Sequence, residues 1–273
     1  MTRTARRTRR TLQVAGAGTA ALLALSACSS SDGSSSSEPD SSASSAGGPS
    51  GTVTVFAAAS LKESFTTLGE KFEKEHPGTK VTFSFGGSDS LAASITGGAP
   101  ADVFASASPK TMKIVTDAGG AAGTPATFVR NELEIATLPG NPDDVASLKD
   151  LTDPGLKVVL CAEEVPCGAA ARTALDAADL KLTPVSYEQD VKAALTKVEL
   201  KEADAAVVYK TDVHAAGDKV EGVEFPESAD AVNDYPIARL KDARNADGAE
   251  AFIELVRSAE GQKVLTAAGF LKP

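Results

Sequence analysis

The chain has 273 residues, a formal net charge of −10 at pH 7 and 42% hydrophobic residues. This acidic balance argues against nucleic acid as a partner, because binding a polyanion depends on lysine and arginine. The length is enough for one large domain or for two smaller lobes, each with its own core.

Residues 1–27 predict an export signal. Five arginines in MTRTARRTRR precede the apolar run TLQVAGAGTAALLALSA, which is too short to span a bilayer comfortably. The run ends in Leu-Ser-Ala-Cys at 25–28, which resembles the lipobox of bacterial lipoproteins. That resemblance implies cleavage before Cys28, a diacylglycerol on its sulfur and a mature protein anchored to the membrane outside the cytoplasm. An uncleaved anchor or an ordinary secreted protein is the alternative.

Residues 28–50 follow as a serine-rich segment that also contains glycine, proline and acidic residues. Such a composition buries too little apolar surface to offset the entropy of ordering. We expect a flexible tether here, which leaves residues 51–273 as the folded part.

The first half of the folded part alternates strands and helices. Strands are expected at 53–56, 81–85 and 102–107, and helices from Ser60, over about 90–96 and over 108–119. In the first helix the apolar residues recur at spacings of 4, 3 and 4, at Leu61, Phe65, Leu68 and Phe72. This order predicts a parallel sheet with helices on both faces.

The second half gives shorter and less regular signals. Strands are expected at 131–139, within 151–161, and at 204–209, 223–227 and 231–240. Helices are expected at 168–180, 186–203 (one helix or a pair) and 246–270. We therefore predict two α/β lobes with mainly parallel sheets. Lobe 1 would comprise residues 51–131 and 235–273, and lobe 2 residues 132–234.

Two cysteines remain once Cys28 is lipidated, namely Cys161 and Cys167 in CAEEVPC. An exported pair this close in sequence can form a disulfide in an oxidising compartment. A metal site would need more ligands, and the two histidines, His76 and His214, lie far from both cysteines in sequence.

Hydrogen-bond donors recur where strands are predicted to end and helices to begin. They lie at Ser60, Ser88, the turn around Cys167, Val191 and Tyr209. Ligands of open α/β sheets bind at this edge, and helix N-termini hold anions without needing lysine. Structural roles are the alternative: Ser60 and Glu63 fit a capping box, Ser88 fits a helix cap, Tyr209 fits a core tyrosine, and the Cys167 turn can be structural alone.

Several of these segments together resemble one family. VTVFAAASL, FGGSDSLAASITGGAPADVFASA, VPCG, EQDV and DAAVVYKTD occur in the order seen in periplasmic molybdate-binding proteins of ABC transporters, from about Val53 to Pro273. The resemblance implies a class II periplasmic-binding-protein fold, in which two lobes joined by a two-stranded hinge close on a tetrahedral oxyanion. It also implies a monomeric receptor that takes molybdate or tungstate, without a cofactor, and passes it to a permease with its ATPase.

The same resemblance assigns the ligand contacts. The hydroxyl and N–H groups of Ser60 and Ser88, the N–H groups of Cys167 and Val191, and the hydroxyl of Tyr209 would hold the oxyanion. Cys167 replaces an alanine that is common in the family, where only the N–H is needed. Asp89 replaces a small hydroxyl residue, so its carboxylate must point away from a dianion.

The donor set suits molybdate, a dianion that has no proton to give near pH 7. Phosphate keeps a proton and favours a site that also contains an acceptor. Sulfate or a carboxylate remains an alternative ligand, whereas iron is disfavoured because Tyr187, Tyr209 and Tyr235 are not adjacent.

Two other classes of protein remain as alternatives. A hydrolase would need a base beside Ser60 or Ser88, and neither histidine is flanked by an orienting acid, so we expect no enzymatic activity. A purely structural surface lipoprotein is the other alternative.

Overall fold

The computed structural model describes residues 48–273. The predicted export signal, the lipidation site at Cys28 and most of the tether lie outside the described residues. Within residues 48–273, no helix combines the length and the apolar character needed to cross a bilayer.

A first five-stranded sheet contains the strands from both ends of the folded chain. Its order is β2-β1-β3-β10-β4. The strands are β1 (Gly51–Ala58), β2 (Thr79–Gly86), β3 (Val103–Ala105), β4 (Ala126–Asn131) and β10 (Asn233–Arg239). β1 runs parallel to β2 and β3, whereas β10 runs antiparallel to β3 and β4.

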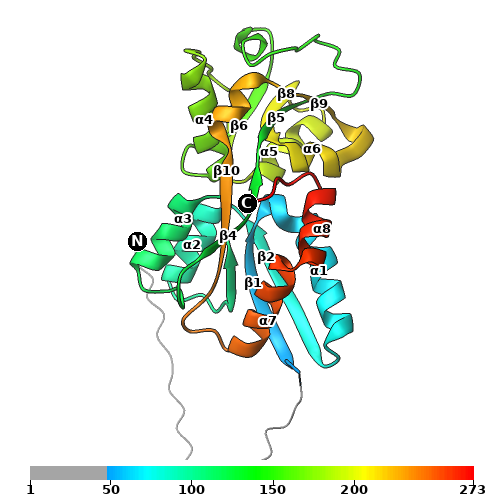
Figure 1. Cartoon of the computed structure of the whole chain (residues 1–273). Helices are drawn as coiled ribbons and strands as arrows, with labels where there is room; N and C mark the ends of the chain where they lie inside the picture. The colour runs from blue at the N-terminus through cyan, green and yellow to red at the C-terminus, as the bar shows by residue number, and fades with distance from the viewer. Residues whose placement is uncertain (1–47) are drawn as a thin grey trace, which may run out of the picture. The chain divides into compact units, whose positions relative to one another are not determined.

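Helices cover both faces of this sheet (Figure 1). One face carries α1 (Lys62–Glu75), α7 (Ala246–Arg257) and α8 (Ala259–Ala267), and the other carries α2 (Ser88–Thr96) and α3 (Pro109–Asp117). The predicted apolar stripe of α1 is fully buried. Within it, Phe65 meets Phe252 of α7 edge to face at 5.8 Å between ring centroids.

A second five-stranded sheet is built from the middle of the chain. Its order is β7-β6-β8-β5-β9. The strands are β5 (Leu133–Thr137), β6 (Val158–Cys161), β7 (Ser186–Glu188), β8 (Ala205–Tyr209) and β9 (Glu221–Val223). The helices around it are α4 (Pro166–Ala177), α5 (Val191–Glu199) and α6 (Lys210–Ala216), and short 3-10 helices lie at Ala59–Leu61, Asp150–Thr152, Gly217–Lys219 and Pro226–Ala231.

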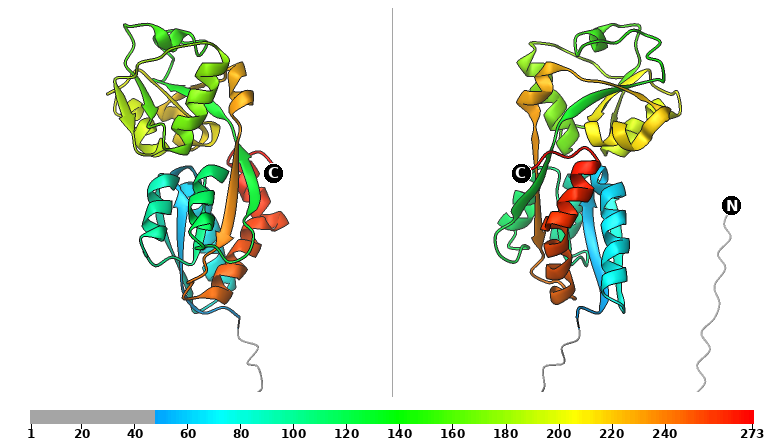
Figure 2. Two further views of the ribbon diagram at one scale, coloured as in Figure 1. Left: turned by 90° about the vertical axis from the view of Figure 1, so that its left-hand side faces the viewer. Right: turned by 45° about the vertical axis from the view of Figure 1, so that its right-hand side comes forward.

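The chain passes twice between the two sheets, once from β4 to β5 and once from the 3-10 helix Pro226–Ala231 to β10. The β4–β5 segment and β10 run side by side there (Figure 2). The predicted α/β fold with two lobes is confirmed. Both sheets are mixed, because β10 and β5, the strands at the crossings, pair antiparallel with their neighbours.

Some elements differ from the sequence prediction. The strand expected at 131–139 is β5 (Leu133–Thr137). β4 (Ala126–Asn131) was not predicted; it belongs to the other sheet and is separated from β5 by Glu132. In the segment expected as one helix or a pair at 186–203, Ser186–Glu188 form the strand β7. The helix begins only at Val191, because Asp190 caps it by accepting a hydrogen bond from Ala193 N–H at 2.9 Å. The expected helix at 246–270 is interrupted at Ser258, which ends α7 and caps α8.

Two further differences lie in the second sheet's surroundings. α6 was not predicted, because this helix is only seven residues long and most of its residues are polar. The strand expected at 223–227 shares only Val223 with the observed strand. β9 spans Glu221–Val223, and Pro226 starts a 3-10 helix, since proline cannot donate to a strand ladder.

Candidate functional site

A cavity with about 200 Å³ of empty space, part of it open to solvent, lies where segments of both sheets meet. All five residues singled out in the sequence line it: Ser60, Ser88, Cys167, Val191 and Tyr209. The remaining lining residues are small or apolar apart from one acid: Ala58, Ala59, Gly86, Gly87, Ala107, Val165, Pro166 and Asp190. The folded chain therefore brings together donors that are distant in sequence.

Ser60 reaches the cavity from the turn that follows β1. It lies in the 3-10 helix Ala59–Leu61 and is 5% exposed. Its Oγ lies 2.8 Å from Tyr235 Oη, and its side chain makes no capping hydrogen bond to α1. The capping-box alternative for Ser60 and Glu63 is therefore wrong. The alanines before Ser60 leave the backbone accessible from the cavity.

Ser88 is the first residue of α2, and Gly87 precedes it as the N-cap. Ser88 Oγ accepts a hydrogen bond from Ala107 N–H at 3.0 Å, so the hydroxyl does not cap the helix. Gly87 also approaches the other lobe closely. A Cβ at position 87 would lie 2.4 Å from Gln189 O, so any side chain there would hold the lobes apart.

Cys167 and Val191 lie in the first turns of α4 and α5, where backbone N–H groups have no partner within the helix. Cys167 is joined to Cys161 by a disulfide, with the two Cα atoms 5.8 Å apart. The bond ties the end of β6 to the first turn of α4. The predicted pairing is thus present in the structure, and it leaves the Cys167 sulfur occupied.

Tyr209 ends β8 and is 1% exposed. Its Oη accepts a hydrogen bond from Asn233 Nδ2 at 2.6 Å. Burial raises the pKa of Tyr209 well above its ordinary value, so the phenol keeps its proton. Its ring meets that of Tyr235 edge to face, with centroids 6.0 Å apart.

The electrostatics of the cavity come from backbone groups. The N-terminal turns of α2, α4 and α5 contribute to the lining and give it partial positive charge. Among the described residues that line it there is no lysine or arginine. Asp190 is the acid of the lining, and its Oδ1 accepts from Ala193 N–H. Asp89 does not line the cavity. This agrees with the requirement that its carboxylate point away from a bound dianion.

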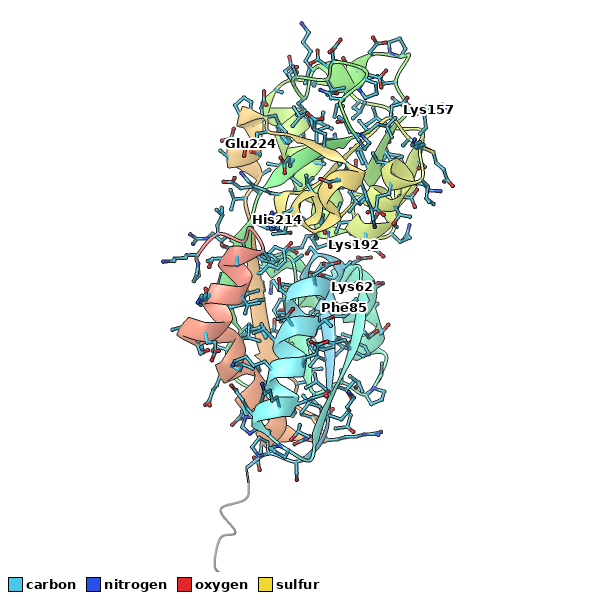
Figure 3. The ribbon with its side chains drawn as sticks, turned by 90° about the vertical axis from the view of Figure 1, so that its right-hand side faces the viewer. Lys62, Phe85, Lys157, Lys192, His214 and Glu224 are labelled. Atoms are coloured by element: carbon cyan, nitrogen blue, oxygen red, sulfur yellow. A yellow bond between two sulfur atoms is a disulfide. The ribbon has the colours of Figure 1, made fainter. Side chains whose placement is uncertain are left out.

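An ion pair joins the two lobes beside the cavity. Lys192 of α5 lies at the start of α1, where Figure 3 also labels Lys62. Its Nζ is 3.0 Å from Glu63 Oε2 of α1 and 3.1 Å from Asp212 Oδ1 of α6. Asp212 is fully buried, and its Oδ2 accepts from Tyr209 N–H at 3.3 Å. Burial raises the pKa of Asp212 to about 6, although Lys192 acts in the opposite direction.

Sequence reasoning missed the residues behind the lining hydroxyls, namely Asn131, Asn233 and Tyr235. They come from β4 and β10, and no local motif marks them as part of a site. The two histidines that a hydrolase would need are not in the lining. Across residues 48–273, no group of three or more His, Cys, Asp or Glu side chains is arranged to hold a metal ion.

Comparison with known proteins gives consistent matches. The family model described as bacterial extracellular solute-binding protein matches residues 53–271. The chain is 46% identical to "Molybdate-binding protein ModA" of Mycobacterium tuberculosis over 222 residues, which cover 81% of this chain and 85% of that protein.

Solved structures also match. The substrate-binding domain of a putative molybdenum ABC transporter from Clostridium difficile is 32% identical, with a TM-score of 0.61, over 82% of this chain and all of that one. The periplasmic molybdate-binding protein of Azotobacter vinelandii has a TM-score of 0.71 at 22% identity, over 81% of this chain and 99% of that one. The second match supports the fold alone.

Proposed function

Because the chain belongs to the family of bacterial extracellular solute-binding proteins, we propose that it captures molybdate and delivers it to an ABC permease. The observation that carries this proposal is the cavity in which Ser60, Ser88, Cys167, Val191 and Tyr209 meet. The relatives at 46% and 32% identity, named for molybdate or molybdenum, support the choice of ligand. Tungstate, which carries the same charge and shape, is proposed as a second ligand.

The proposed contacts are hydrogen bonds from neutral donors. The hydroxyls of Ser60, Ser88 and Tyr209 would reach the anion together with backbone N–H groups, including those of Cys167 and Val191. A hydrogen bond to a charged group contributes roughly 1.5–3 kcal/mol. Five to seven such bonds, less the costs of desolvation and closure, are consistent with sub-micromolar affinity, beyond roughly −8 kcal/mol.

Capture is proposed to proceed by lobe closure. Lobe 1 (51–131 and 235–273) supplies Ser60 and Ser88, and lobe 2 (132–234) supplies Cys167, Val191 and Tyr209. A ligand that bridges the lobes stabilises the closed arrangement, since it makes its full set of bonds only there. The close approach of Gly87 to Gln189 O supports this view.

A lipid anchor at Cys28 and a serine-rich tether over residues 28–50 complete the proposal. They would keep a monomeric receptor at the outer face of the membrane, within reach of its permease and ATPase. The Leu-Ser-Ala-Cys sequence at 25–28 supports the anchor. Metabolic labelling with a fatty acid, compared between the native chain and Cys28→Ala, tests it.

The ligand is tested by calorimetric titration of the purified protein with molybdate, tungstate, sulfate and phosphate. We expect tight one-to-one binding of molybdate and tungstate, weak binding of sulfate and no heat with phosphate. Tight binding of sulfate with weak binding of molybdate would replace the proposed ligand. Absence of heat with all four anions would overturn the oxyanion receptor altogether.

A further inference from the structure

Each hydroxyl in the cavity has a neighbour placed to donate a hydrogen bond to its oxygen. Ser88 Oγ accepts from Ala107 N–H at 3.0 Å, and Tyr209 Oη accepts from Asn233 Nδ2 at 2.6 Å. A hydroxyl carries a single proton, so an oxygen that accepts from behind is left to donate its proton elsewhere. For Ser88 and Tyr209 the cavity is one such direction, because both residues line it.

The orientation of the Asn233 amide is fixed by a second contact. Its Nδ2 also lies 3.4 Å from Pro166 O, and a carbonyl oxygen can only accept. If the amide were flipped, Asn233 Oδ1 would face Pro166 O, and two acceptors would lie against each other. Asn233 belongs to β10 of the first sheet, whereas Tyr209 and Pro166 belong to β8 and α4 of the second lobe. Asn233, the first residue of the strand that leads into the first sheet, thus orients the Tyr209 hydroxyl.

The Ser60 hydroxyl is oriented by a longer series of hydrogen bonds of the same kind. Asn131 Oδ1 accepts from Glu132 N–H at 3.1 Å, which turns Asn131 Nδ2 towards Thr211 Oγ1 at 2.8 Å and Tyr235 Oη at 3.4 Å. Tyr235 Oη accepts a hydrogen bond from this amide, and it can then donate its own proton to Ser60 Oγ at 2.8 Å. The Ser60 proton is in turn left free for the cavity.

Burial keeps both tyrosines in this network protonated. The pKa values of Tyr209 and Tyr235 are raised above the ordinary value, chiefly by desolvation. The rings of Tyr209 and Tyr235 also meet edge to face, with centroids 6.0 Å apart. A dianion in the cavity is a strong acceptor for the Tyr209 proton, because hydrogen bonds to charged groups are roughly twice as strong as neutral ones.

We propose that Asn233 is a specificity-determining positioning residue, which turns the Tyr209 proton, and not a lone pair of its oxygen, into the cavity. A hydroxyl oriented in this way favours an oxyanion that carries no proton over one that must donate a proton. The inference rests on the proposed oxyanion function. It extends that function by assigning the choice between unprotonated and protonated anions to residues outside the lining.

The test compares molybdate with arsenate, a tetrahedral anion that retains a proton through much of the neutral range, by calorimetry at pH 7. In Asn233→Asp the carboxylate can only accept, so the Tyr209 proton turns away from the cavity and an oxygen lone pair faces it. We expect a loss of molybdate affinity of about 100-fold and a fall of at least about tenfold in the molybdate-to-arsenate preference. Asn141→Asp adds the same charge in a loop that contributes nothing to the lining, and should change neither value.

A second variant, which adds no charge, separates the effect of the direction of the Tyr209 proton from the effects of added charge and altered packing. Asn233→Leu should weaken molybdate binding by about tenfold. In a Tyr209→Phe background, which has no hydroxyl to orient, the same substitution should change affinity by less than about twofold. An equal loss for both anions in Asn233→Asp, or an unchanged effect of Asn233→Leu in the Tyr209→Phe background, would overturn the inference. A native protein that binds neither molybdate nor tungstate would instead overturn the proposed function.

Discussion

Ser60 and Ser88 are both nearly inaccessible to solvent, yet neither caps the helix beside it. Their hydroxyls are bonded to Tyr235 Oη and to Ala107 N–H. With Tyr235 as the donor to Ser60, as inferred above, each serine keeps one proton for a ligand. The double variant Ser60→Ala with Ser88→Ala should therefore weaken molybdate binding by about 100-fold or more, while the fold is retained.

Calorimetry checks this expectation, and Ser94→Ala is the matched control. Ser94 lies on the same helix as Ser88 but is exposed, and its Oγ bonds only to Ser90 O within the helix. Unchanged affinity in the double variant would show that the two hydroxyls do not contact the ligand.

Asp212 gives a prediction for the pH dependence of stability. Burial raises its pKa from 3.8 to about 6 in the folded chain, where it faces Lys192 and, beyond it, Glu63. Between these values the unfolded chain has lost the proton and the folded chain still holds it. The contribution of Asp212 to the free energy of unfolding therefore falls by roughly 3 kcal/mol as pH rises from about 4 to about 6. Above about pH 6 the contribution stays at this lower value.

Asp212→Asn removes this titration. Urea unfolding at a series of pH values should show the variant gaining stability relative to the native chain as pH rises from about 4 to about 6. A difference between the two proteins that does not vary with pH would contradict the raised pKa.

At the scale of elements, the disulfide between Cys161 and Cys167 fixes the path from β6 into α4. The closed loop is short, so its loss should lower the free energy of unfolding by about 2 kcal/mol. Because α4 carries the Cys167 N–H into the cavity, molybdate affinity should fall as well. Thermal unfolding and calorimetry with and without a reductant measure both effects. The variant Cys161→Ala with Cys167→Ala should not respond to the reductant, and a response there would place the effect elsewhere.

The ion pair between Lys192 of α5 and Glu63 of α1 links helices of different lobes. An ion pair with one exposed partner contributes roughly 0.2–1 kcal/mol. Glu63→Gln should therefore speed molybdate dissociation by about two- to fivefold, measured by stopped flow at low salt, and the effect should shrink as salt is added. Glu202→Gln is the control, because Glu202 pairs with Lys197 inside one lobe at 2.7 Å. Equal dissociation rates for native and Glu63→Gln protein would show that the pair does not hold the lobes together.

The elements also show what the sequence could predict. Long amphipathic helices such as α1 and strands with regular alternation such as β2 were predicted because their apolar periodicity is local. β4 was not predicted, and the strand expected at 131–139 began too early for β5, because the change of sheet at Glu132 is defined only by the tertiary fold. The five lining residues were predicted from motifs, whereas Asn233 and Tyr235 lie on β10 and enter the site only through its position between the lobes.

For the whole molecule, a ligand that bridges two lobes stabilises the folded state by mass action. At a free concentration of 100 times Kd, molybdate should add about 2.7 kcal/mol to the free energy of unfolding. For a folded part of this size, that corresponds to a rise in Tm of about 5–10 °C. Scanning calorimetry measures the shift. The variant Ser60→Ala with Ser88→Ala should show little of it at the same molybdate concentration, and a full shift there would point to binding outside the cavity.

The position of β10 in the first sheet has a consequence for the order in which the protein matures. Although it is made late, β10 lies between β3 and β4, and among the described strands it is the one neighbour of β4. A nascent chain that has not yet reached Asn233 can assemble the second sheet, which is continuous in sequence, but cannot close the first. It also lacks the side chains that orient Ser60 and Tyr209. The complete cavity therefore forms only when the last part of the chain has been made.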